Sequence, residues 1–218
     1  MTAASPTIVF FPGFATDERL LSIPYPSWNI ISLPPSHTIQ EDWNAIQSQL
    51  MSPYTIIGFS LGVDMALKCL DDQDPNLKEI LLFGARPQYT RAEIKLVKTY
   101  LIKDYTNYLE QFYKACFKTK KPKFWPELEK NYLKKFNLEK LLKQLDLVSQ
   151  INLSKHKIPA QAQFIHGEND QIAPLPHIQS LIPQDQLTII KNAEHIDVLY
   201  LQMESIKKLS RLSDNTKA

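Results

Sequence analysis

Short apolar runs alternate along the chain with longer stretches of mixed polarity. The runs are rich in Ile, Val, Leu and Phe, and their apolar and polar positions do not alternate cleanly, which is typical of strands buried on both faces of a parallel sheet. The candidate strands are Thr7 to Phe11, Asn29 to Leu33, Tyr54 to Gly58, Glu79 to Phe83, Gln161 to His166 and Leu187 to Ile190.

Helical patterns separate these runs. In residues 36–50 the apolar side chains fall on one helical face: Ile39, Trp43, Ile46 and Leu50. Thr38 and Glu41 form a T-x-x-E sequence at its start, which predicts a capping box. Residues 60–71 and 195–210 also have a helical pattern. The alternation predicts an α/β fold, doubly wound, with a mostly parallel central sheet and helices on both faces.

Residues 88–157 break this rhythm because they contain no candidate strand. Apolar residues recur there at steps of three and four from Ile94 to Cys116, and less regularly as far as Val148. We therefore predict a helical cap inserted into a core made of residues 1–87 and 158–218. The lysine-rich stretch Lys118 to Lys123 has the pattern of an exposed loop between the inserted helices.

Composition narrows the class of protein. A chain of 218 residues, 44% apolar and 22% charged, is typical of one globular domain with a cap. Cys69 and Cys116 lie in helical patterns without metal-ligand spacing, so we expect buried thiols and no disulfide. Neither a signal-peptide core nor a membrane-spanning run is visible. We expect a cytoplasmic protein with no stable membrane association and no nucleic-acid partner.

The segment Gly58-Phe59-Ser60-Leu61-Gly62 is a G-x-S-x-G sequence between a candidate strand and a candidate helix. In that context a serine occupies a strained turn that exposes its hydroxyl, and side chains at the flanking positions would clash. The chain has only five glycines, and the other three each follow a candidate strand: Gly13, Gly84 and Gly167. Ligands bind at this edge of open α/β sheets, so the glycines predict one catalytic rim. The alternative is that glycines simply mark strand ends.

A serine nucleophile needs a base, and His195 stands in the loop between the last candidate strand and the last helical pattern. We predict that His195 is this base. His166 ends a strand before a glycine, and we expect it to be structural, with a hydrogen bond to the loop backbone. The remaining histidines are expected on the solvated surface: His37, His156 and His177.

The acid that orients the base is expected in the loop after the fifth strand, where Glu168 and Asp170 are both candidates. Asp170 is preferred because of its offset from Gly167 and because Pro174 closes the loop. The order Ser60, Asp170, His195 is that of an α/β-hydrolase. Two backbone N–H groups should stabilise the oxyanion: that of Leu61, and that of Phe14 after Gly13.

On these motifs the chain resembles the α/β-hydrolase superfamily over nearly its full length. Its "GFSLG" elbow and helical cap look like those of the carboxylesterases that cleave pimeloyl-acyl-carrier-protein methyl ester in biotin synthesis. It departs from the family pattern at Val63, where a glycine is common, and at Pro12-Gly13, where His-Gly is usual. We also expect the family's N-terminal hairpin to be missing, because the first candidate strand begins at Thr7. The resemblance implies a serine esterase that needs no metal or organic cofactor, with Phe59 and Phe112 in the substrate pocket.

Charge bears on the substrate. Residues 88–157 hold sixteen Lys and Arg against seven Asp and Glu, whereas the rest of the chain holds nine against sixteen. A basic cap would steer an acidic acyl carrier protein to the site, and the proposed contacts are Arg91, Lys95, Lys98 and Lys121. Alternatively, these lysines only solvate helix faces, or the cap is a lid that lies on anionic membrane.

The sequence thus predicts an esterase for a carrier-bound pimeloyl-type methyl ester. A thioesterase or short-chain ester hydrolase that acts on free small molecules is the first alternative. A hydrolase-fold binding protein without turnover is the second.

Overall fold

The structure is a computed structural model that describes residues 6–70, 74–117 and 121–203. In this part of the chain, all strands are parallel and form one sheet in the order β2-β1-β3-β4-β5-β6. The strands are β1 (Thr7–Phe11), β2 (Asn29–Ser32), β3 (Tyr54–Phe59), β4 (Leu77–Phe83), β5 (Ala162–Gly167) and β6 (Leu187–Ile190). Each predicted strand is confirmed to within two residues at either end.

The strand order places a topological switch at β1. The chain leaves β1 for β2 at one edge of the sheet, and then builds from β3 toward the other edge. Because β1 and β3 are hydrogen-bonded neighbours with Phe11 opposite Gly58, the loops that follow them begin side by side. Such a switch point opens a crevice at the carboxyl ends of the strands, and ligands bind there.

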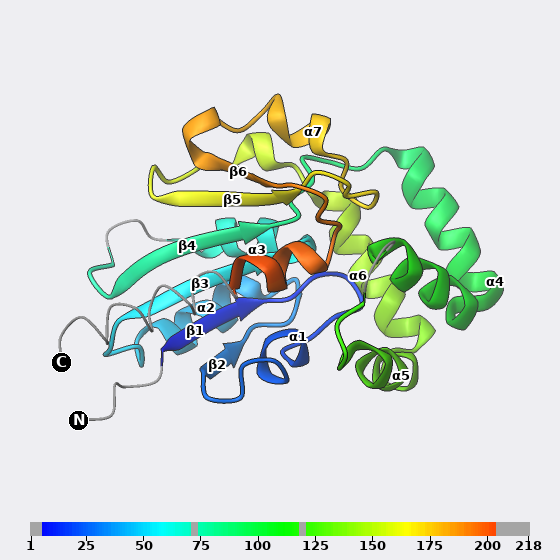
Figure 1. Cartoon of the computed structure of the whole chain (residues 1–218), viewed down its shortest axis with the longest axis horizontal. Coiled ribbons are helices and arrows are strands. Elements are labelled where there is room, and N and C mark those ends of the chain that lie inside the picture. The colour runs from blue at the N-terminus through cyan, green and yellow to red at the C-terminus, as the bar shows by residue number, and fades with distance from the viewer. Residues whose placement is uncertain (1–5, 71–73, 118–120, 204–218) are drawn as a thin grey trace.

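Helices bury both faces of the sheet, which explains the unbroken apolar runs. Helices α2 (Ile39–Gln47) and α3 (Leu61–Cys69) cover one face, and the helical residues 197–203 lie on the other (Figure 1). Val9, Phe10 and Phe11 in β1 are fully buried as a result. The remainder of the predicted C-terminal helix, residues 204–210, lies outside the described residues. The short elements α1 (Arg19–Ser22), α7 (Leu175–Gln179) and η2 (Gln184–Gln186) were not predicted.

The segment between β4 and β5 is helical. It contains α4 (Arg91–Cys116), α5 (Trp125–Lys135), α6 (Leu138–Gln150) and the short η1 (Leu153–Lys155), which lie beyond the carboxyl ends of the strands (Figure 1). We call α4, α5 and α6 the cap. Helix α4 is kinked at Asp104, where φ is −165° and ψ is 89°, and the Asp104 carboxylate accepts the Asn107 N–H at 3.0 Å to start the second half.

The predicted capping box of α2 is wrong. Thr38 is the N-cap, but its φ of −99° and ψ of 17° are not extended, and its side chain makes no cap hydrogen bond. Its hydroxyl instead lies 3.2 Å from the Asp42 carboxylate. A capping box forms at α4, where Thr90 is extended and its hydroxyl accepts the Glu93 N–H while the Glu93 carboxylate accepts the Thr90 N–H. A T-x-x-E sequence forms the box only where the backbone before the helix is extended.

We predict that Thr90→Ala lowers the free energy of unfolding by about 1 kcal/mol, because an orphan N–H of α4 loses its acceptor. Thr38→Ala is the matched control, and it should cost less than about 0.5 kcal/mol because no cap bond is lost. Urea unfolding of both variants measures the difference. Equal losses would contradict this assignment of the caps.

Candidate active site

Ser60 occupies a strained turn between β3 and α3. Its φ of 54° and ψ of −115° place a non-glycine residue at positive φ, which is uncommon and is concentrated at functional sites. The Ser60 N–H donates to the Phe83 carbonyl at 2.8 Å, which ties the turn to β4. Gly62 permits this turn, because a Cβ at that position would lie 1.9 Å from the Phe11 carbonyl oxygen. At Gly62, the structure thus contains the steric clash that was expected for a side chain at a position flanking Ser60.

Three of the predicted residues meet in a hydrogen-bonded chain. Nε2 of His195 lies 3.1 Å from Ser60 Oγ, and its Nδ1 lies 2.7 Å from Asp170 Oδ2. Ser60 comes from the end of β3, Asp170 from the loop after β5 and His195 from the loop after β6. His195 and Asp170 are nearly inaccessible to solvent. The ring of His195 is supported by Phe59, whose centroid lies 5.1 Å away.

The surroundings of Asp170 determine which atoms in the Asp170–His195–Ser60 series carry protons. Burial opposes ionisation, but the nearby His195 and His166 rings and the Ala173 N–H lower the pKa of Asp170. Its Oδ1 accepts the N–H groups of Ile172 and Ala173 at 2.9 and 2.7 Å. An ionised carboxylate can only accept hydrogen bonds, so Nδ1 of neutral His195 carries the proton. Nε2 is then free to accept from the Ser60 hydroxyl.

The second carboxylate candidate, Glu168, lies elsewhere. Its exposed side chain accepts the Asn192 N–H at 3.0 Å, on the outside of the loop. Of the two acids, the structure therefore brings only Asp170 to His195.

Two of the other histidines bear on the sequence analysis. His166 is buried and its Nε2 lies 2.6 Å from the Ala173 carbonyl, which confirms the expected bond to the loop backbone. His156 corrects the expectation of a solvated histidine. Its side chain is only 15% exposed, and its Nε2 lies 2.9 Å from the carboxylate of Asp64, a buried residue of α3. His37 and His177 are exposed, as expected.

The loop after β1 lies against the turn at Ser60. A Cβ on Gly13 would lie 3.0 Å from Ser60 Cβ and 3.1 Å from the Phe59 carbonyl oxygen, so Gly13 allows close approach of the two backbones. Phe14 follows Gly13, and Leu61 begins α3 directly after Ser60. Both residues predicted to supply oxyanion N–H groups thus adjoin Ser60 in space or in sequence.

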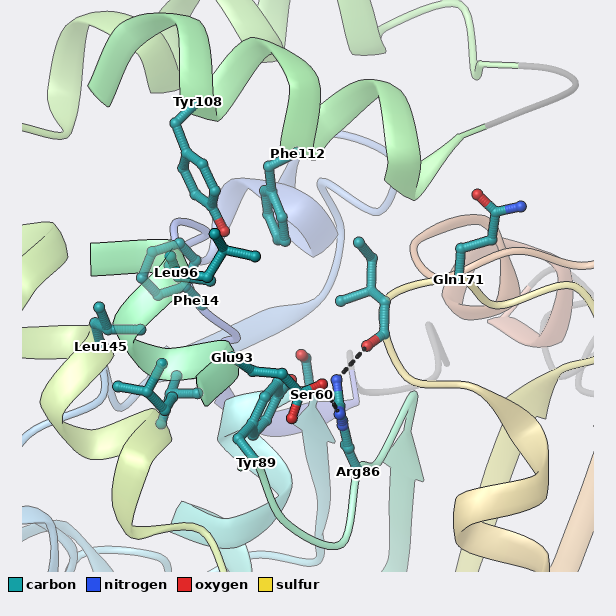
Figure 2. Close-up of a pocket in the computed structure, with 14 residues that line it drawn as sticks. Phe14, Ser60, Arg86, Tyr89, Glu93, Leu96, Tyr108, Phe112, Leu145 and Gln171 are labelled. Atoms are coloured by element: carbon teal, nitrogen blue, oxygen red, sulfur yellow. Dashed lines mark hydrogen bonds and ion pairs between the residues drawn. The ribbon is translucent and has the colours of Figure 1, made fainter. Parts of the chain in front are cut away.

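A cavity of about 230 Å³ opens at Ser60, between the core and the cap. Figure 2 shows Tyr108 and Phe112 reaching toward it from α4, with Ser60, Arg86 and Tyr89 clustered on the opposite side. Most of its wall is apolar or aromatic. The lining residues are Phe14, Ser60, Arg86, Tyr89, Glu93, Ile94, Leu96, Val97, Tyr108, Phe112, Leu145, Val148, Gln171 and Ile172.

Arg86 is a residue of this wall that the sequence analysis missed. It pairs with Glu93, donates to the Ile172 carbonyl at 3.4 Å and stacks over the Tyr89 ring at 4.1 Å (Figure 2). Burial opposes ionisation of Glu93, but the Thr90 N–H and Arg86 hold its pKa at about 2. Glu93 is therefore ionised, and the guanidinium of Arg86 compensates its negative charge. Its position two residues after Gly84, on the predicted rim, was a signal that could have identified Arg86.

The remaining predicted residues divide between the cavity and other places. Phe112 lines the cavity, with its ring 5.7 Å edge-on from Phe14. Phe59 does not line it, since its ring is buried behind the site against His195.

The predicted cationic contacts also separate. Arg91, Lys95 and Lys98 are exposed on α4 and line a second hollow of about 390 Å³, which shares Tyr89 and Ile94 with the first cavity. Lys121 lines neither hollow. Its ammonium lies 2.9 Å from the carboxylate of Glu129 on α5.

Cys69 and Cys116 are buried thiols, as expected. Burial raises the pKa of Cys69 to about 12 and that of Cys116 well above its ordinary value, so neither is a reactive thiolate. Within residues 6–70, 74–117 and 121–203, no three His, Cys, Asp or Glu side chains are grouped to hold a metal ion. Over the same residues, no helix has the length and apolarity needed to cross a bilayer.

Comparison with known proteins identifies the fold. No family model and no curated protein matches the sequence. An esterase from Exiguobacterium antarcticum has a TM-score of 0.76 at 16% identity, over 96% of this chain and 92% of its own. A bromoperoxidase from Bacillus anthracis has 0.73 at 16% identity, over 94% and 91%. BioG from Haemophilus influenzae has 0.60 at 14% identity, over 89% and 91%. The chain therefore has the α/β-hydrolase fold.

Asp197, two residues beyond His195, makes stability depend on pH. Burial and the charges of Glu194 and Asp170 raise its pKa to about 6, above the ordinary 3.8. Because the folded pKa is the higher one, this group favours the folded state fully below pH ~4, and the contribution is lost as the pH rises through about 6.

We predict that Asp197→Asn raises the free energy of unfolding by about 1 kcal/mol at pH 7.5 and not at pH 4. The asparagine oxygen can still accept the Glu194 N–H that Asp197 now accepts, so only the charge is removed. Asp185→Asn, at an exposed position in η2, is the control and should change neither value. Urea unfolding at the two pH values decides, and a variant that is no more stable at pH 7.5 would contradict the prediction.

Proposed function

We propose that the protein is a serine hydrolase that cleaves carboxylic esters. The observation that carries this proposal is the hydrogen-bonded series from Asp170 through His195 to Ser60, in which Ser60 sits on a positive-φ turn and lines an apolar cavity. Nucleophile, base and orienting acid stand in hydrogen-bond order, which is the arrangement that activates a serine hydroxyl. The esterases among the structures of similar fold are consistent with it.

In the first half of the reaction, Ser60 Oγ attacks the ester carbonyl carbon while Nε2 of His195 accepts the hydroxyl proton. Asp170 keeps Nδ1 protonated and stabilises the imidazolium that forms. Nε2 then gives its proton to the leaving alcohol, and an acyl group remains on Ser60. In the second half Nε2 of His195 takes a proton from water while the water oxygen attacks the acyl carbon. Nε2 then returns this proton to Ser60 Oγ as the acyl–Oγ bond breaks, which releases the carboxylic acid and restores the serine.

The carbonyl oxygen becomes negative in both halves. We assign the N–H groups of Phe14 and Leu61 to this oxyanion, because both adjoin Ser60 and Leu61 stands at the N-terminus of α3. Preorganised N–H donors of this kind stabilise the transition state more than the substrate, because the charge develops only during the reaction.

We predict that Ser60→Ala abolishes turnover of p-nitrophenyl butyrate, with a loss of about 10⁴-fold or more, and that Asp170→Asn lowers kcat by about 10³- to 10⁴-fold. Glu168→Gln is the matched control in the same loop and should retain wild-type kcat. Labelling with a fluorophosphonate should depend on Ser60. A wild-type protein that neither turns over nor labels would favour the alternative, a binding protein without catalysis.

For the substrate we propose a methyl ester on a pimeloyl-type acyl chain carried by acyl carrier protein, in biotin synthesis. Three observations support it. The cavity wall is apolar enough for an acyl chain. The hollow lined by Arg91, Lys95 and Lys98 adjoins that cavity and offers positive charge to an acidic carrier. The sequence resembles the esterases of this pathway, and BioG is among the proteins that share the fold.

The rival within hydrolases acts on free short-chain esters or thioesters and makes no use of the α4 cations. The rate of such an enzyme would depend neither on Arg91, Lys95 and Lys98 nor on ionic strength.

We predict that Lys95→Glu lowers kcat/KM for the carrier-bound ester by about 10-fold at low salt, and that the deficit shrinks above about 0.3 M salt, because exposed charges are then screened. The same variant should cleave p-nitrophenyl butyrate normally. Lys130→Glu, an equal charge change at an exposed position of α5, is the control. Identical losses in the two variants, or equal rates on carrier-bound and free esters, would count against the carrier proposal.

A further inference from the structure

We propose that two cap side chains, Gln144 and Tyr113, hold the loop after β1 in the form that binds the oxyanion. They are positioning residues that act through Ala15 and Phe14. The inference rests on the proposed function, since it assigns a role within the same site.

The backbone of Ala15 is in an unfavourable conformation. Its φ is 52°, in the left-handed region that residues with a Cβ rarely adopt. Ala15 is fully buried, so its polar backbone groups cannot be satisfied by bulk water. Such a conformation persists only where neighbouring groups enforce it.

The cap provides both partners that enforce it. The Ala15 N–H donates to Oε1 of Gln144 on α6 at 2.8 Å, and the Tyr113 hydroxyl on α4 donates to the Ala15 carbonyl at 2.6 Å. These bonds join residues 129 and 98 positions apart in the sequence. Both peptide groups of Ala15 are therefore fixed by side chains of the cap.

A third cap helix fixes the loop further along. Lys135 on α5 lies 2.6 Å from the Asp17 carboxylate, and the Tyr132 hydroxyl contacts the Asp17 backbone at 3.4 and 3.5 Å. Hydrogen bonds from Arg19 and Lys135 outweigh burial and lower the pKa of Asp17, so the pair with Lys135 is charged.

These contacts bear on catalysis because Phe14 lies between two fixed points. On one side Gly13 is packed against Ser60, and on the other the peptide between Phe14 and Ala15 is held by Gln144. Within the loop, the Gly13 carbonyl accepts the Thr16 N–H at 3.3 Å and the Thr16 hydroxyl at 3.1 Å, and the ring of Phe14 is packed edge-on against Phe112. The cap thus restrains the peptide that directly follows Phe14, and the direction of an N–H donor determines how well it stabilises an oxyanion.

The test compares three variants of α6 on p-nitrophenyl butyrate. Gln144→Leu removes the acceptor and should lower kcat by about 10- to 100-fold, with KM within about twofold of wild type, because a transition-state contact is weakened. Gln144→Glu retains an acceptor oxygen and should keep most of the wild-type kcat at pH 8. Gln150→Leu, which removes an exposed bond to Asp146 on the same helix, should change neither constant.

Tyr113→Phe is the second variant. It retains the buried ring and removes only the hydroxyl, so it should reproduce the fall in kcat while the protein stays folded by circular dichroism. Wild-type kcat in both Gln144→Leu and Tyr113→Phe would overturn the inference and leave the proposed esterase intact. A loss in Gln144→Glu equal to that in Gln144→Leu, or a change confined to KM, would overturn it as well. Absence of turnover in the wild-type protein would instead refute the proposed function, and the inference with it.

Discussion

The close approach of α3 to the end of β1 is the constraint on which the site depends. A single methyl group at Gly62 would lie 1.9 Å from the Phe11 carbonyl oxygen, so the first turn of the helix packs directly on the strand backbone. The chain reverses sharply just before this contact, at Ser60, whose φ is 54°. The loop after β1 lies beside the serine because β1 and β3 are neighbours in the sheet.

Around this turn, burial and hydrogen bonding act together. His195 and Asp170 are withdrawn from water, which would by itself disfavour the carboxylate, yet two N–H groups and the imidazole compensate the charge. Gly84 contributes in a similar way to Gly62. Its φ is +58°, and a Cβ there would lie 3.0 Å from Cε1 of His195, so the histidine ring occupies the space that a side chain would fill.

The cap has three physical roles that separate by residue. Its apolar side chains, such as Phe112 and Val148, close the cavity over Ser60. Its exposed cations on the first half of α4 face solvent beside that cavity. Two of its polar side chains, the buried Tyr113 and the half-buried Gln144, reach across to the backbone of Ala15. By our inference, the packing of the cap on the loop after β1 both encloses the cavity and positions the oxyanion-binding N–H of Phe14.

The sequence by itself determined the strands, the cap helices as a class and the sharp turn at Ser60, because apolar runs, helical spacing and glycines report on local backbone requirements. It ranked Asp170 above Glu168 from loop position alone. Only the tertiary structure decided that Thr90 and not Thr38 forms a capping box, that His156 binds the buried Asp64, and that Gln144 meets Ala15. These outcomes depend on the backbone conformation before a helix, or on contacts between residues about a hundred positions apart, and no local pattern encodes either.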